Sequence, residues 1–177
     1  MALSVMTIPV QTQTADYVIS HAQTSVDGDA EGIGPGDIVC FEAGTRTTRI
    51  LLKNFNGTAA NPIIIQNCNG KTTIDVRTQN NPGYSIAINN SNHFRLTGSG
   101  HPDHEYGIVT YGGTMGVTVG GLSGTGIEID HINANFAEFA SFMVKTDPNC
   151  DPTTWRENFV MQDVYIHHNY AYHPNDG

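Results

Sequence analysis

Two polar pairs, Asp130-His131 and His167-His168, carry the side chains best suited to chemistry in this sequence. They stand 37 residues apart, each in a stretch whose alternation of apolar and polar residues predicts a β-strand. If the two stretches are neighbouring parallel strands, about 4.8 Å apart, their outward side chains cluster. Such a row could bind a metal or move protons in a glycosidase, and Asp130 could pair with Asp163 as two carboxylates. Solvated polar side chains on a strand are the other interpretation.

The loop 147–157 carries oxygen ligands at alternating positions. Asp147, Asn149 and Asp151 resemble the first three ligands of an EF-hand calcium loop. Pro152 stands where that loop needs glycine, and Asn158 stands where it needs a closing Glu. The sequence therefore excludes an EF-hand and leaves two interpretations, a simpler Ca²⁺ site at the three ligands or a proline-stiffened corner loop.

Aromatic and basic side chains in and after this loop are predicted to contact a sugar. Trp155 offers a flat apolar face that stacks on a sugar ring, or that packs within the fold instead. The remaining members of this predicted substrate-binding set are Arg156, His167, His168 and Tyr170.

These side chains must be positioned by short strands that recur from residue 39 onward, many of them followed by Gly or Asn. The strands fall into three series: Val39, Ile74 and Ile108; Ile50, Ile86 and Val117; and Ile63, Phe94, Ile127 and Val164. No segment between them has the length and 3.6-residue apolar period of a crossover helix. A strand that must lie parallel to its copy one period later, without helices, predicts an all-β solenoid. We therefore predict a single-stranded parallel β-helix of roughly four coils.

The two ends of the chain are predicted to differ. Residues 1–35 have the least regular pattern and are assigned to an N-terminal extension and cap, because an uncapped first rung exposes apolar surface and unpaired backbone groups. Residues 36–177 are assigned to the β-helix. The sequence stops directly after a strong strand, which predicts continuation of the coil or self-association at an open C-terminal edge.

Asparagine recurs at strand ends, where stacked amide side chains can hydrogen-bond from one rung to the next and satisfy backbone groups at the corners. We assign this structural role, rather than a catalytic one, to Asn67, Asn89, Asn90, Asn133, Asn135 and Asn169.

Composition limits the function classes. The chain of 177 residues fits one domain, and its net charge of −9 lacks the basic footprint that nucleic-acid binding needs. A polyanionic substrate would require a local basic patch or a bridging divalent cation. No stretch approaches the roughly 20 apolar residues that span a bilayer.

Cys40 and Cys68 both fall in predicted strands that could lie on neighbouring coils. Two interpretations stay open, a disulfide between them or two buried thiols. No C-x-x-C pair is present, so a zinc or redox motif is not indicated.

Two stretches carry a family resemblance. The sequence PGDIVCFEAGTRTTRILLKNFNGTAANPIIIQNCNG at 35–70 resembles the first coil of the alginate lyase and chondroitinase B branch of the pectin-lyase-like superfamily. The sequence EIDHINANFAEFASFMVKTDPNCDPTTWRENFVMQDVYIHHNY at 128–170 is similar to secreted bacterial β-helix repeat proteins. The resemblance implies a right-handed parallel β-helix.

The same resemblance implies a set of catalytic residues. In the alginate lyase and chondroitinase B relatives, calcium held by acidic side chains neutralises the substrate carboxylate and a lysine removes the C5 proton. Lys145 follows Glu138 by seven residues, a spacing similar to one acid–lysine pair of that family. The second acid of the pattern falls at Ala140, which cannot bind calcium. If the protein is catalytic, the implied residues are Lys145, Glu138 and His131.

From these observations we expect a secreted or cell-surface protein that binds or processes a polysaccharide, by β-elimination of a uronate polymer if it is catalytic. The alternatives are a non-catalytic surface or adhesin module, and an inactive piece of a larger protein.

Overall fold

The computed structural model describes residues 14–146 and 160–172, and its strands form three parallel sheets. In spatial order, sheet A contains β1 (Tyr17–Ile19), β3 (Ile38–Phe41), β6 (Ile63–Asn67), β9 (Phe94–Thr97), β12 (Gly124–Asp130) and β15 (Met161–His167). Sheet B contains β2 (Ser25–Asp27), β5 (Ile50–Lys53), β8 (Tyr84–Asn89), β11 (Met115–Gly120) and β14 (Ala140–Val144). Sheet C contains β4 (Gly44–Arg46), β7 (Thr72–Asp75), β10 (Ile108–Tyr111), β13 (Ile132–Asn135) and β16 (Tyr170–Tyr172).

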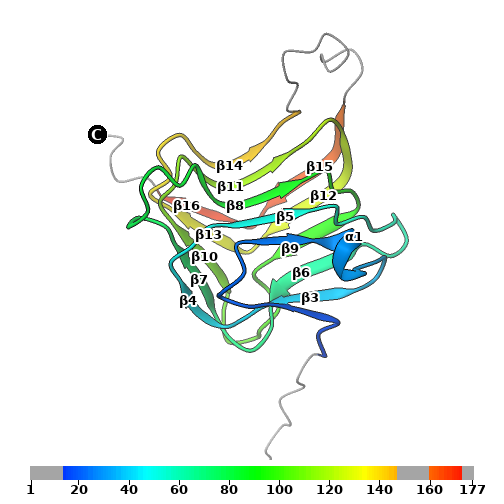
Figure 1. The fold of residues 1–177 in the computed structure, drawn as a ribbon, viewed down its shortest axis with the longest axis horizontal. Helices are drawn as coiled ribbons and strands as arrows, with labels where there is room; N and C mark the ends of the chain where they lie inside the picture. The colour runs from blue at the N-terminus through cyan, green and yellow to red at the C-terminus, as the bar shows by residue number, and fades with distance from the viewer. Residues whose placement is uncertain (1–13, 147–159, 173–177) are drawn as a thin grey trace, which may run out of the picture.

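The chain visits the sheets in a fixed order. From β3 onward it passes from sheet A to sheet C to sheet B and then returns to sheet A, so that each strand pairs in parallel with the strand one circuit later. Figure 1 shows these strands stacked side by side around a common interior. Within the described ranges the single helix is the four-residue α1 (Gly28–Glu31), which lies between β2 and β3, so no described connection after β3 is helical. This all-β arrangement is compatible with a parallel β-helix.

Two of the three predicted series are confirmed residue by residue. In sheet A, Ile63 pairs with Phe94, Phe94 with Ile127, and Ile127 with Val164; the sheet B series is Ile50, Ile86 and Val117. These positions point inward, because neighbouring residues of a strand alternate between the two faces of its sheet.

The third series is wrong in both of its steps. Val39 lies in sheet A, where it pairs with Ile65, whereas Ile74 lies in sheet C and pairs with Arg46 of β4. Ile74 and Ile108 do share sheet C, but Ile74 pairs with Thr110. The error arose because β4 is a three-residue strand, Gly-Thr-Arg, without apolar alternation.

Part of the segment predicted as an N-terminal cap belongs to the sheets. β1 pairs with β3 and β2 pairs with β5, so each forms the first strand of its sheet. Beside them the buried guanidinium of Arg46 donates hydrogen bonds to the backbone oxygens of Ser20, Gln23 and Thr48. Burial lowers the pKa of Arg46 below its ordinary value. Arg46 thereby satisfies carbonyl groups at the first turn of the stack.

The asparagine prediction is confirmed at three positions where amides bridge circuits. The Asn135 amide donates to the Thr110 oxygen at 3.4 Å. The Asn67 amide donates to the Gly70 oxygen at 3.0 Å and accepts from the Gly100 nitrogen at 3.1 Å. Asn169 donates to the Ile129 oxygen and accepts from the Ile132 nitrogen, both at 2.9 Å. Each amide therefore joins two turns of the chain.

No helix in the part of the chain that the structure describes is long and apolar enough to cross a membrane.

Of the two interpretations left open for Cys40 and Cys68, the disulfide is confirmed, with the two Cα atoms 5.5 Å apart. The bond joins β3 to the residue after β6, and so ties the first full circuit to the second.

We predict that replacing both cysteines with alanine lowers the free energy of unfolding by about 3 kcal/mol, because the bond closes a loop with a sequence separation of 28. Denaturant unfolding measures this. A reductant should lower the free energy of unfolding of the wild type by a similar amount and leave that of the double variant unchanged. Equal free energies of unfolding for the oxidised wild type, the reduced wild type and the double variant would contradict the prediction.

Candidate functional site

The outer face of sheet A holds two rows of polar side chains that the strand register places side by side. Because Phe94 and Ile127 point inward, the next residue on each strand points outward. One outward row contains Arg95, Glu128 and Tyr165. The adjacent outward row contains Thr97, Asp130 and His167. Strands β9, β12 and β15 therefore contribute one residue each to both rows.

Asp130 is the centre of this cluster. Its side chain is fully buried, and it accepts hydrogen bonds from Arg95 Nε at 2.6 Å, Arg95 Nη2 at 2.9 Å and Thr97 Oγ1 at 2.6 Å. The Nδ1 atom of His131 lies 2.5 Å from Asp130 Oδ1. Burial alone would raise the pKa of Asp130, but the hydrogen bonds from Arg95, Thr97 and His131 outweigh it and hold that pKa below its ordinary value. Asp130 is therefore a carboxylate at neutral pH, with a bidentate arginine partner.

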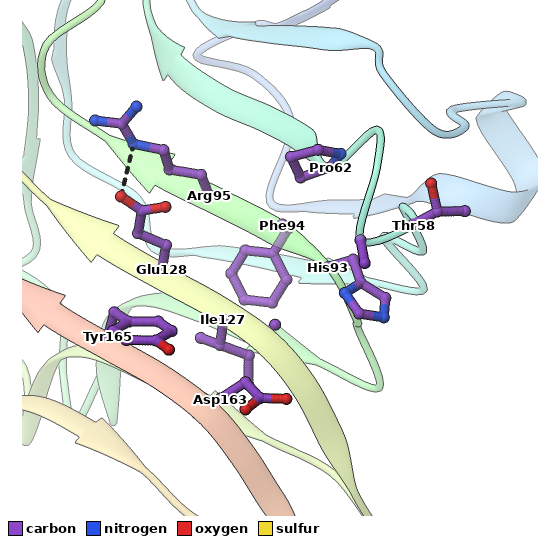
Figure 2. A pocket seen from close by; sticks show the side chains of 11 residues that line it. Thr58, Pro62, His93, Phe94, Arg95, Ile127, Glu128, Asp163 and Tyr165 are labelled. Atoms are coloured by element: carbon purple, nitrogen blue, oxygen red, sulfur yellow. Dashed lines mark ion pairs between the residues drawn. The ribbon is translucent and has the colours of Figure 1, made fainter.

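Glu128 extends the network toward solvent. Its Oε1 atom lies 3.4 Å from Arg95 Nε and 3.1 Å from His167 Nε2. Figure 2 draws the Arg95–Glu128 ion pair at the rim of a pocket. Arg95 thus contacts both carboxylates, and these contacts raise the pKa of its guanidinium, the hydrogen bond to Asp130 contributing most.

Glu128, Asp130 and His167 are the described residues closest to a metal-binding arrangement. One ligand atom from each lies within 4.8 Å of the other two. The guanidinium of Arg95 already supplies the positive charge between the two carboxylates, so a metal ion would have to displace it. An imidazole ligand also suits zinc better than Ca²⁺, which takes oxygen ligands.

The two polar pairs, Asp130-His131 and His167-His168, lie side by side, as the sequence predicts. Asp130 pairs with His167 across β12 and β15, and the rings of His131 and His168 stack with centroids 5.5 Å apart and an interplanar angle of 7°. Both His131 and His168 have positive φ, at 53° and 50°, where the chain turns from sheet A to sheet C. His167 Nδ1 lies 2.7 Å from His168 Nδ1, so one ring donates to the other.

The predicted carboxylate pair of Asp130 and Asp163 is wrong. Asp163 lies near the start of β15, between residues that pair with Thr125 and Ile127, whereas Asp130 ends β12. Asp163 accepts a hydrogen bond from Thr125 Oγ1 at 3.0 Å. The two carboxylates share a sheet but occupy opposite ends of their strands.

A pocket of about 310 Å³ opens beside the cluster. Its lining includes Arg95, Glu128 and Tyr165 on one side and His93 and Asp163 on the other, with Thr58 and Pro62 reaching in from the loop after β5 (Figure 2).

The hollow depends on one glycine. His93, Gly126 and Asp163 all have left-handed φ, at 47°, 65° and 52°. A Cβ atom built on Gly126 would overlap the imidazole of His93. The absence of a side chain at 126 therefore leaves room for the His93 ring within the pocket wall.

The catalytic residues implied by the family resemblance do not come together. Glu138 precedes β14 and accepts from Thr114 Oγ1 at 3.3 Å, whereas Lys145 follows β14 and its backbone nitrogen donates to the Val119 oxygen. The five-residue strand β14 lies between the two. His131 lies on a different corner of the structure, beside Asp130.

The other predicted residues divide into three groups. His167 and His168 belong to the cluster on sheet A, and Tyr170 lies beyond the corner in sheet C, its ring centroid 6.3 Å from that of Tyr106. The predicted Ca²⁺ ligands and two of the predicted sugar-contacting residues lie outside the described residues: Asp147, Asn149, Asp151, Trp155 and Arg156.

No family model, no curated protein and no solved structure matches the chain. The geometry of the site is therefore the basis for a proposed function.

Sequence reasoning missed Arg95, Tyr165 and His93. The signal for the first two was present, because the predicted series of Phe94, Ile127 and Val164 places their next neighbours on one outward row. His93 carried no such signal, because its place in the pocket depends on a left-handed backbone at three successive strands.

We predict that Asp130→Asn lowers the free energy of unfolding at neutral pH by about 3 kcal/mol, because it removes one partner of a buried, hydrogen-bonded ion pair. The folded-state pKa of Asp130 lies below the unfolded value of about 4, so its stabilising charge is present above that pH and is lost as the pH falls further. The difference between wild type and variant should shrink toward pH 2.

Denaturant unfolding at several pH values tests this, with Asp103→Asn, an exposed aspartate, as the control. A difference that does not change with pH would contradict the assigned role of the Asp130 charge.

Proposed function

We propose that this protein is a secreted polysaccharide-binding protein with a right-handed parallel β-helix of the pectin-lyase-like type, and that it holds a glycan along the outer face of sheet A. The observation that carries the proposal is the pocket beside Arg95, Glu128 and Tyr165 on that face. It lies on a flank of stacked strands, where an extended polymer can contact several circuits at once.

The chemistry of the pocket suits a sugar. Tyr165 is 62% exposed although it is aromatic, and such a ring offers an apolar face for stacking together with a hydroxyl group. Glu128, Asp163 and Thr58 supply acceptors or donors for hydroxyl groups around the same hollow. A concave site with apolar walls and a few convergent polar groups is typical of small-ligand binding.

The disulfide supports secretion. Structural disulfides persist in oxidising compartments and are rare in the cytosol of most organisms, so the Cys40–Cys68 bond favours an extracellular location.

Binding is favoured over cleavage. β-Elimination as in the resembling lyases would require a second calcium-binding acid at position 140, where this chain has alanine, and Glu138 and Lys145 stand at opposite ends of β14. A non-catalytic surface module needs no such pair and fits the same flank.

Release of unsaturated uronate products from alginate, pectate or chondroitin, followed by ultraviolet absorbance, would instead support an enzyme.

We predict that Tyr165→Ala weakens glycan binding about tenfold or more, because it removes the exposed ring beside the pocket. Affinity electrophoresis against a panel of neutral and acidic polysaccharides provides the measurement. The matched control is Tyr172→Ala, a similarly exposed tyrosine in sheet C, which should leave the affinity unchanged. Absence of binding to every polysaccharide in the panel, or an equal loss in both variants, would refute the proposed site.

A second variant probes the hollow itself. Gly126→Ala should weaken binding and cost roughly 1 kcal/mol or more of stability, because it places a methyl group against His93 at a positive φ. Gly32→Ala is the control: its φ of 73° imposes similar backbone strain, but nothing lies within 4 Å of the added methyl group. If both variants bind glycan like the wild type, the pocket is not the binding site.

A further inference from the structure

We infer that the sugar residue held in this pocket is uncharged, so that the protein selects a neutral glycan over a uronate polymer. This inference rests on the proposed function and concerns the same site. It departs from the uronate substrate that the sequence resemblance implies.

The fixed positive charge of the pocket, the guanidinium of Arg95, is already paired with carboxylates of the protein. Among the described residues that line the pocket, Arg95 is the one lysine or arginine. Two of its nitrogens are bound by the fully buried Asp130, and its Nε also lies 3.4 Å from Glu128. A uronate carboxylate would have to compete with both for a guanidinium that is already bidentate with one of them.

A ligand that enters the pocket meets negatively charged side chains. Glu128 and Asp163 both line the pocket, and Asp163 is exposed. A carboxylate on the sugar would be repelled by these groups, and the chain as a whole carries a net charge of −9. Carboxylates are acceptors only, so they bind the hydroxyl groups of a neutral sugar and cannot donate to a uronate.

The polar side chains and the aromatic ring are arranged around the hollow. Arg95, Glu128 and Tyr165 lie on one outward row across three adjacent strands, and Figure 2 shows Asp163 on the far side of Ile127 from Arg95. Acceptors therefore flank the hollow, and an exposed aromatic ring stands beside them. Hydroxyl groups on opposite edges of one sugar ring can be held in this way while the ring face rests on Tyr165.

The test compares polymers that differ only in charge. Alginate and polygalacturonate are each compared with their carboxyl-reduced forms, in which every carboxylate has become a hydroxymethyl group. Binding is measured with the full chain at pH 8, where an ordinary imidazole is neutral, once with a chelator and once with calcium present. Xylan and a soluble glucan extend the panel.

We expect at least one carboxyl-reduced or neutral polymer to bind, and each reduced polymer that binds to do so at least tenfold more tightly than its parent. Asp163→Asn should reduce the ratio of the affinities for the reduced polymer and its parent severalfold, because it removes one repelling charge. Asp103→Asn, at an exposed position outside the pocket, should leave this ratio unchanged.

Equal or tighter binding of a uronate parent, with or without calcium, would overturn the inference while leaving the proposed function intact. Failure of all the polymers to bind would overturn the proposed function, and the inference with it.

Discussion

Parallel backbone pairing between each strand and its copy one circuit later is the constraint on which the rest of this structure depends. Ile63, Phe94, Ile127 and Val164 stay in register through four successive strands of sheet A. Because side chains alternate, this inward apolar row forces an outward row one residue further along. The polar cluster exists because the core is in register, and a shift of one residue in β12 would bury Glu128 and expose Ile127.

Corners held in left-handed conformations set the direction of the polar side chains. His131 and His168 adopt positive φ at corresponding corners, and their rings stack as a result. Non-glycine residues occupy this region at a cost, which the surrounding structure must offset. At His131 the contact with the buried Asp130 contributes to that offset. The Asp130 carboxylate thus holds both Arg95 on the outer face of sheet A and His131 at the corner.

The sequence allowed two of the three strand series and the adjacency of Asp130-His131 and His167-His168 to be predicted, because each depends on regular alternation or a constant period. It left the Cys40–Cys68 disulfide as one of two open interpretations, because it did not fix which residues of neighbouring strands lie opposite each other. It did not reveal β4, whose inward residue is Arg46 rather than an apolar side chain. The acid–lysine pair of Glu138 and Lys145 was inferred from a spacing alone, and the structure places the strand β14 between the two residues. The pocket was missed because it is created by the absence of a side chain at Gly126, and a lone glycine in a strand has many explanations.

The circuits of this fold are unequal in length. In sheet A the paired residues Val39, Ile65, Leu96, Ile129 and Ile166 stand 26, 31, 33 and 37 residues apart, yet every pairing stays in register. Added residues are therefore accommodated at the turns. In evolutionary terms, residues can be inserted or deleted at one corner without disturbing the strands on either side. The surface of one circuit can therefore change while the neighbouring circuits keep their packing.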